Sequence, residues 1–111
     1  MAGKFEVKAT KNGQFMFNLK ASNGEIILTS EMYKTKKGLK NGIDSVRKNC
    51  KVPARYKVMT AKNKEPYFVL RAGNNQVIGQ SQMYASAAAR DGGIESCKTN
   101  CPGASTIDLS G

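Results

Sequence analysis

Three cysteines and the absence of histidine limit the chemistry open to this chain of 111 residues. Cys97 and Cys101 are separated by one helical turn, so both side chains can share a helix face. A metal site needs further ligands, and no histidine is present to supply one. The odd number of cysteines also argues against a disulfide framework. We therefore predict buried free thiols, with no metal and no cofactor.

Candidates for acid–base and nucleophilic chemistry are few. Asp44 and Glu95 occupy equivalent positions in a repeat described below, but helical spacing places Asp44 on the solvent side. Ser30 and Ser81 also recur without a visible base to activate them, and they suit hydrogen bonds to the backbone between a strand and a helix. No phosphate-binding glycine motif is present. The sequence predicts no catalytic residues and a protein that is not an enzyme.

The charge balance favours an acidic partner. Lys and Arg number 18 against 8 Asp and Glu, a net charge of +10. Several basic residues lie along one predicted helix: Lys34, Lys36, Lys37, Lys40, Arg47, Lys48 and Lys51. Such a stripe suits phosphate contacts, but the equivalent places in the second half carry Ala87, Ala88 and Asp91. Weak, non-specific nucleic-acid binding through this basic patch is therefore the alternative hypothesis for function.

The chain contains one stretch twice. Residues 5–50 align without a gap to residues 56–101, beginning with Phe5 on Tyr56 and ending with Cys50 on Cys101. A match of this length indicates a tandem duplication. Because the whole chain has the size of one domain, we predict a single domain, 1–111, in which two repeats share a core with pseudo-twofold symmetry.

Alternating and helical patterns follow one another in each repeat. In repeat one they predict strands at Lys4–Thr10, Gln14–Lys20 and Glu25–Thr29, then a helix that begins after Thr35. Repeat two predicts strands near Arg55–Thr60, Tyr67–Arg71 and Gln76–Gln80, a helix near Ser86–Asn100, and a short last strand, Thr106–Leu109. The predicted fold class is α+β, an antiparallel sheet with both helices on one side.

Apolar residues on the face of the sheet away from the helices suggest a binding surface. If Phe17, Leu19 and Ile27 face the helices, six residues face the other way: Met16, Ile26, Leu28, Tyr67, Val69 and Val77. An exposed apolar face of this kind would suit a protein or peptide. The leading hypothesis is therefore a non-enzymatic binding or interaction module that uses this apolar sheet face.

These residues resemble the YegP-like family of uncharacterised bacterial proteins, in its duplicated branch. The resemblance is carried by Asn12–Phe15, Ile27–Glu31, Gly42–Val46, Val77–Gly79 and Ser81–Tyr84. It implies a three-stranded sheet plus helix in each repeat, with terminal strands exchanged between repeats, and homodimers among single-repeat relatives. It implies no activity, because the family has no established biochemical function.

No apolar run approaches the ~20 residues of a membrane span, and the first residues lack the apolar segment of a signal peptide. We expect a cytoplasmic protein without a membrane partner.

The duplication also predicts a monomer, because one chain supplies both halves that a single repeat would need to find in a second copy. Sedimentation velocity at micromolar concentration should show a species of the mass of one chain, 12.0 kDa. A stable dimer at that concentration would contradict this expectation.

Overall fold

Each repeat folds as three strands followed by a helix. The computed structural model describes residues 3–110. Repeat one contains β1 (Lys4–Ala9), β2 (Phe15–Lys20), β3 (Ile26–Thr29) and α1 (Lys36–Asn49). A short 3-10 helix, η1 (Pro53–Arg55), leads into repeat two, which contains β4 (Tyr56–Thr60), β5 (Pro66–Arg71), β6 (Val77–Gln80) and α2 (Ala87–Asn100). The last strand is β7 (Ser105–Asp108).

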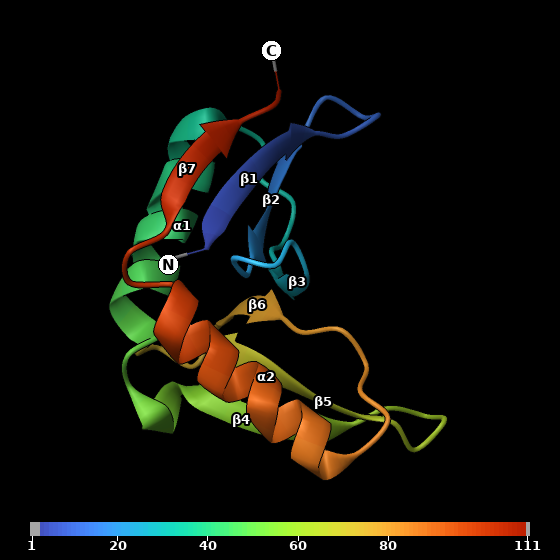
Figure 1. Cartoon of the computed structure of the whole chain (residues 1–111). Helices are drawn as coiled ribbons and strands as arrows, with labels where there is room; N and C mark the ends of the chain where they lie inside the picture. Colours follow the sequence, from blue (N-terminus) through green and yellow to red (C-terminus); the bar gives the residue numbers. More distant parts are fainter. Residues whose placement is uncertain (1–2, 111) are drawn as a thin grey trace.

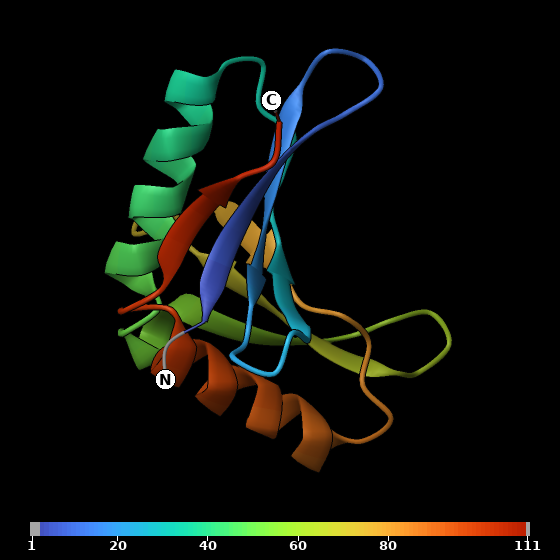
Figure 2. The same cartoon turned by 45° about the horizontal axis from the view of Figure 1, so that its top comes forward.

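The strands form a seven-stranded sheet in the order β4-β5-β6-β3-β2-β1-β7. Neighbouring strands are antiparallel except for β7, which runs parallel to β1. Figures 1 and 2 show the strands of the two repeats crossing at a large angle, with α1 against one half and α2 against the other. The α+β class, the duplication and the short last strand are as predicted. Among the strands of residues 3–110, β7 alone leaves its own repeat, where it pairs with β1 of repeat one.

The two halves of the sheet meet at a weak seam. One residue pair, Thr29 with Gln80, joins β3 to β6. Both helices span this seam: α1 packs on β2 of its own repeat and on β5 and β6 of the other, while α2 packs on β5 and on β3. Apolar burial under the helices therefore holds the repeats together where the hydrogen-bond ladder is almost absent.

The register of β3 differs from the prediction because the strand contains a bulge. Leu19 pairs with Leu28 and Lys20 with Ile26, so Ile27 is the extra residue between them. Ile27 and Leu28 are consequently both buried in the core, although strict alternation would have sent Leu28 to the outer face. The assignment of Leu28 to the apolar sheet face is wrong for this reason.

The helices begin where the sequence places them. The Thr35 hydroxyl accepts a hydrogen bond from the Gly38 amide at 3.0 Å, and the Ser86 hydroxyl accepts one from the Ala89 amide at 3.1 Å. Each cap satisfies an amide that the first helical turn leaves unpaired.

The glycine retained in both helices makes room for a tyrosine. A Cβ added at Gly42 would lie 2.6 Å from Cζ of Tyr33, and one at Gly93 would lie 2.6 Å from Cζ of Tyr84. Each tyrosine ring stacks on the central phenylalanine of its repeat, Tyr33 on Phe17 in repeat one. The glycine thus allows close approach of a side chain to the helix.

Replacing Gly42 by alanine should lower the free energy of unfolding by about 1–3 kcal/mol through overpacking against Tyr33. The substitution itself favours the helix by about 1 kcal/mol, so the sign of the effect identifies the clash. Gly92→Ala is the matched control, because a Cβ there meets no atom within 4 Å, and it should stabilise. Urea denaturation of the parent and both variants measures the difference. Equal or higher stability of Gly42→Ala would contradict the packing argument.

Candidate functional site

The repeated serines have a structural role. The Ser30 hydroxyl accepts a hydrogen bond from the Phe17 amide at 2.9 Å and donates to the Glu31 carbonyl at 2.8 Å. Ser81 makes the same two bonds with the Phe68 amide and the Gln82 carbonyl. These bonds fasten the segment that leaves β3 or β6 to the adjacent strand, as the sequence predicted. Neither hydroxyl is available as a nucleophile.

The three thiols are buried, as predicted. Cys101 donates a long hydrogen bond to the Val46 carbonyl across the repeats, at 3.6 Å. Burial raises the pKa of Cys97 to about 12, and a hydrogen bond with Cys50 raises the pKa of Cys101. Among residues 3–110, no three Cys, Asp or Glu residues cluster where they could hold a metal ion. Cys97 and Cys101 are therefore neutral parts of the core, whereas the hydrogen bond with Cys101 lowers the pKa of Cys50.

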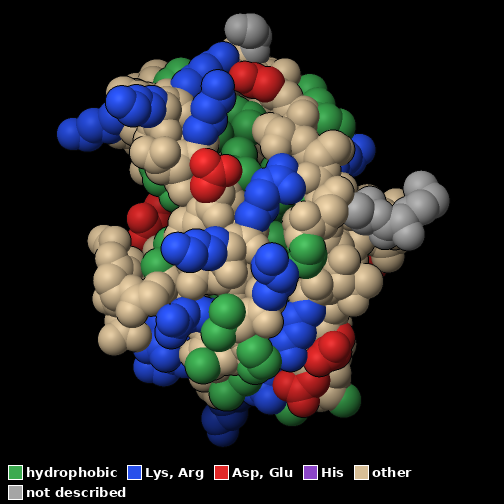
Figure 3. All heavy atoms as spheres, turned by 90° about the vertical axis from the view of Figure 1, so that its left-hand side faces the viewer, with side chains coloured by type: hydrophobic (Ala, Val, Ile, Leu, Met, Phe, Trp, Pro, Cys, Tyr) green, Lys and Arg blue, Asp and Glu red, His purple; other side chains and the backbone are tan. Residues whose placement is uncertain are grey.

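Two side chains of the basic patch, Lys36 and Arg47, make contacts within the chain. Lys36 forms an ion pair with Asp108 of β7 at 3.2 Å. Arg47 lies over the ring of Phe5, 4.9 Å from its centroid, and donates to the Thr106 hydroxyl at 3.1 Å. The other members, Lys34, Lys37, Lys40, Lys48 and Lys51, are exposed. Figure 3 shows this side of the molecule with Lys and Arg side chains separated by hydrophobic and acidic groups.

The outer face of the sheet has a polar centre. A row of paired residues crosses it from Val69 through Gln80, Thr29 and Asn18 to Glu6. Val69 is itself 5% exposed, and only Ile26 and Val77 among the six predicted residues are exposed. Met16 and Tyr67 are half-buried. The face is therefore a set of separate apolar residues around polar ones.

An ion cluster occupies the repeat-one end of that polar row. Lys20 lies 3.0 Å and Lys4 3.6 Å from the Glu6 carboxylate oxygens. The hydrogen bond from Lys20 lowers the pKa of Glu6, so the carboxylate stays ionised. The two lysines neutralise the buried Glu6 carboxylate. Because the carboxylate is engaged in these ion pairs, it is not a free acid–base group.

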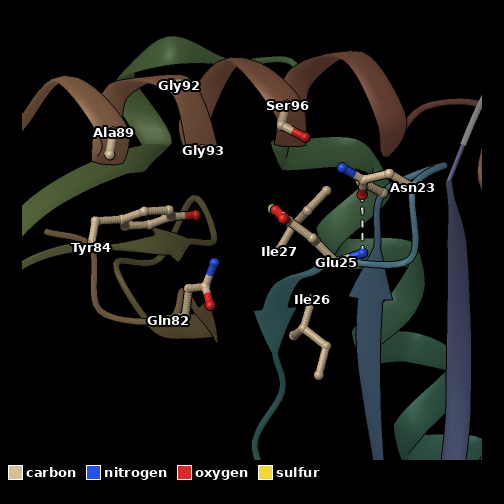
Figure 4. Close-up of a pocket in the computed structure, with 11 residues that line it drawn as sticks. Asn23, Glu25, Ile26, Ile27, Gln82, Tyr84, Ala89, Gly92, Gly93 and Ser96 are labelled. Carbon is tan, nitrogen blue, oxygen red and sulfur yellow. Dashed lines mark hydrogen bonds between the residues drawn. The ribbon is translucent and has the colours of Figure 1, made fainter.

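A cavity of about 370 Å³ lies between α2 and β3, where the two repeats meet. Its volume falls within the range of small-molecule sites. Small residues of α2 form one side of the cavity, and the segment after β6 and the β2–β3 region of repeat one form the others. The lining residues are Ala21, Asn23, Glu25, Ile26, Ile27, Gln82, Tyr84, Ala89, Gly92, Gly93 and Ser96. Figure 4 shows α2 above the cavity, with the Tyr84 and Glu25 side chains entering from opposite sides.

Polar groups converge inside this α2–β3 cavity. Figure 4 shows the Tyr84 hydroxyl and the Glu25 carboxylate directed toward each other, with the Gln82 amide below and the Ser96 hydroxyl above. Burial raises the pKa of Tyr84, and the negative charge of Glu25 adds to this effect against the hydrogen bond from Gln82. Tyr84 is therefore a neutral donor facing an acceptor, across a space lined by Ile27.

Sequence analysis did not find this cavity, because its walls come from both repeats. The available signal was the glycine pair in the second helix. Gly93 is explained by the tyrosine beneath it, whereas a Cβ at Gly92 would meet no neighbouring atom. The absence of a side chain at Gly92 thus leaves this part of the cavity wall open.

Comparison with known proteins places the chain in a family. The model of the domain of unknown function DUF1508 matches residues 10–56 and again residues 61–108, so the two matches start one repeat apart. The chain belongs to the DUF1508, or UPF0339, family. The UPF0339 protein of Acinetobacter baylyi is 56% identical over 111 residues, which cover 100% of both chains. The resemblance to the YegP-like family is thereby confirmed.

Two solution NMR structures of family members share the fold. Escherichia coli YegP, described as a protein of unknown function, superposes with a TM-score of 0.94 at 49% identity, over 100% of this chain and 96% of that one. The UPF0339 protein of Shewanella oneidensis gives 0.92 at 52% identity, over 99% and 93%. These relatives carry no named catalytic function. In the described residues, no helix is both long and apolar enough to span a bilayer.

The raised pKa of Cys97 predicts how stability depends on pH. The folded chain keeps this proton up to about pH 12, whereas the unfolded chain releases it near about pH 8.5. Between about pH 8.5 and 12, this thiol should lower the free energy of unfolding by about 1.4 kcal/mol for each unit that the pH rises. Urea denaturation between about pH 8.5 and 10 should therefore give a shallower decline for Cys97→Ala than for the parent. Parallel declines would show that Cys97 is not the group responsible.

Proposed function

We propose that the protein is a non-enzymatic binding module whose ligand enters the α2–β3 cavity. The observation that carries this proposal is the convergence of Tyr84, Glu25 and Gln82 on one space between the repeats. A few polar groups placed around an apolar floor are the usual design of a small-molecule site. The three buried, unpaired cysteines support a cytoplasmic location, where thiols remain reduced.

The chemistry of the walls defines the ligand class. Ile27 and the Tyr84 ring supply apolar contact, and the Glu25 carboxylate supplies an acceptor for a hydroxyl or amide donor. A cationic ligand is disfavoured at long range, because the chain carries a net charge of +10. A small, neutral and largely apolar molecule with one hydrogen-bond donor fits these conditions best.

The structure supports a binding module more than catalysis. The serines that recur accept hydrogen bonds from backbone amides, the thiols are buried, and Asp44 is exposed on α1. The nucleic-acid alternative depends on the basic patch, and two of its members are engaged by β7. Neither alternative has a convergent site comparable with the cavity.

Protein-observed NMR with a library of neutral fragments tests this proposal. Bound fragments should shift the amide signals of Ile27, Tyr84 and Gly93 of the labelled protein, and Gly92→Leu should abolish binding by filling the cavity. Ala88→Leu is the matched control, because Ala88 is exposed on the same helix outside the cavity lining. Glu25→Gln should weaken fragments that carry a donor and spare those that do not. Fragments that bind Gly92→Leu as well as the parent would refute the site.

A further inference from the structure

The last strand, β7, lies along the edge of the repeat-one sheet, beside helix α1. β7 lies along β1 in parallel, with Val7 opposite Asp108, and the Leu109 amide donates to the Val7 carbonyl at 2.8 Å. Above β7, helix α1 contributes Lys36 to Asp108 and Arg47 to Thr106. Val7 is consequently 3% exposed. The groove between β1 and α1 is thus filled by a strand of this chain.

Repeat two presents the equivalent sheet edge, β4, without a strand beside it in the described residues. β4 ends the sheet, so over the described residues no strand lies on its outer side. Val58, which the repeat aligns with Val7, is 51% exposed. Lys98 lies over the ring of Tyr56, 5.7 Å from its centroid, as Arg47 lies over Phe5. The valine of the edge strand and the cation over its aromatic neighbour are therefore retained, while no strand covers them in the described residues.

We propose that the groove between β4 and α2 binds an extended segment of a partner protein, which adds to β4 as a parallel strand. Main-chain hydrogen bonds of this kind provide affinity for a peptide at a free sheet edge. The repeat supports the geometry: the Val7 carbonyl faces β7, so the aligned Val58 carbonyl faces the open edge. A free edge with an exposed valine is otherwise a liability for aggregation.

Differences between the helices define the side chains that the segment needs. Where α1 has Lys36 and Lys40 near Asp108, α2 has Ala87 and Asp91 at the aligned positions. An acidic residue at that place of the segment would meet no cation. An apolar residue would instead pack on Val58 and on Ile94, which aligns with Ile43 of α1.

The same differences argue against a second copy of this chain as the occupant. Its own strand β7 would bring Asp108 toward Asp91, and two carboxylates in one groove repel each other. The preferred segment therefore keeps the small polar residues of β7 but carries valine or isoleucine at the place of Asp108.

Two synthetic heptapeptides test this inference with the full chain. The first, Ala-Ser-Thr-Ile-Val-Leu-Ser, copies residues 104–110 with valine at the place of Asp108, and the second has the native aspartate. Titration of the labelled protein should shift amide signals of β4 and α2 with the valine peptide, with a dissociation constant of about 1 mM or tighter. The aspartate peptide should bind about tenfold more weakly, a difference of about 1.4 kcal/mol.

Variants at Val58 locate the binding. Val58→Lys should weaken the valine peptide by about tenfold or more, and Val58→Thr, which keeps the shape of a β-branched residue, should weaken it less. Val77→Lys is the matched control, because Val77 is also an exposed valine of repeat two but lies on β6, and it should leave binding unchanged. Shifts confined to β1, binding unaffected at Val58, or no shifts with either peptide would each overturn the proposal. So would a dimer that forms through β4 in the absence of peptide.

Discussion

The structure depends on apolar burial across a seam that hydrogen bonds barely close. Thr29 and Gln80, which form the pair between β3 and β6, are themselves aligned by the repeat, as are Cys50 and Cys101. Equivalent positions meet because the pseudo-twofold axis passes between them. A residue on such an axis meets its own counterpart, so two large side chains would collide there. Leu28 and its counterpart Gly79 solve this problem: a Cβ at Gly79 would already lie 3.2 Å from Leu28 Cδ1.

The two repeats diverge where their surroundings differ. Each keeps the parts that build its own unit, namely the serine that binds a strand amide and the tyrosine that lies beneath a glycine. At the outer edges of the sheet, however, β7 covers repeat one alone. The residues that hold β7, Lys36 and Arg47, become Ala87 and Lys98 in repeat two. Contacts with β7 therefore explain in part why α1 carries a basic patch and α2 does not.

Much of the fold could be predicted from the sequence because the duplication reports each element twice. The strands and the starts of both helices followed from patterns within one repeat. Leu28 did not, because a bulge changes the side to which the following residue points, and consecutive apolar residues conceal it. The cavity was also missed, since Glu25 and Tyr84 belong to different repeats and only the three-dimensional seam brings them together. Periodicity describes faces within an element, not spaces between elements.

Reactive groups in this fold are used for its own construction, and this constrains the kinds of function it can support. Buried serines accept hydrogen bonds from backbone amides, buried thiols fill part of the core, and the buried carboxylate of Glu6 is neutralised by Lys20. Catalysis needs groups whose protonation and geometry remain free to change during a reaction. Binding needs only shape, unpaired edges and a few fixed polar atoms. The places where repeat two lacks what fills repeat one, above all the uncovered Val58, supply such features. Divergence between the copies thus leaves an uncovered sheet edge in repeat two without disturbing the shared core.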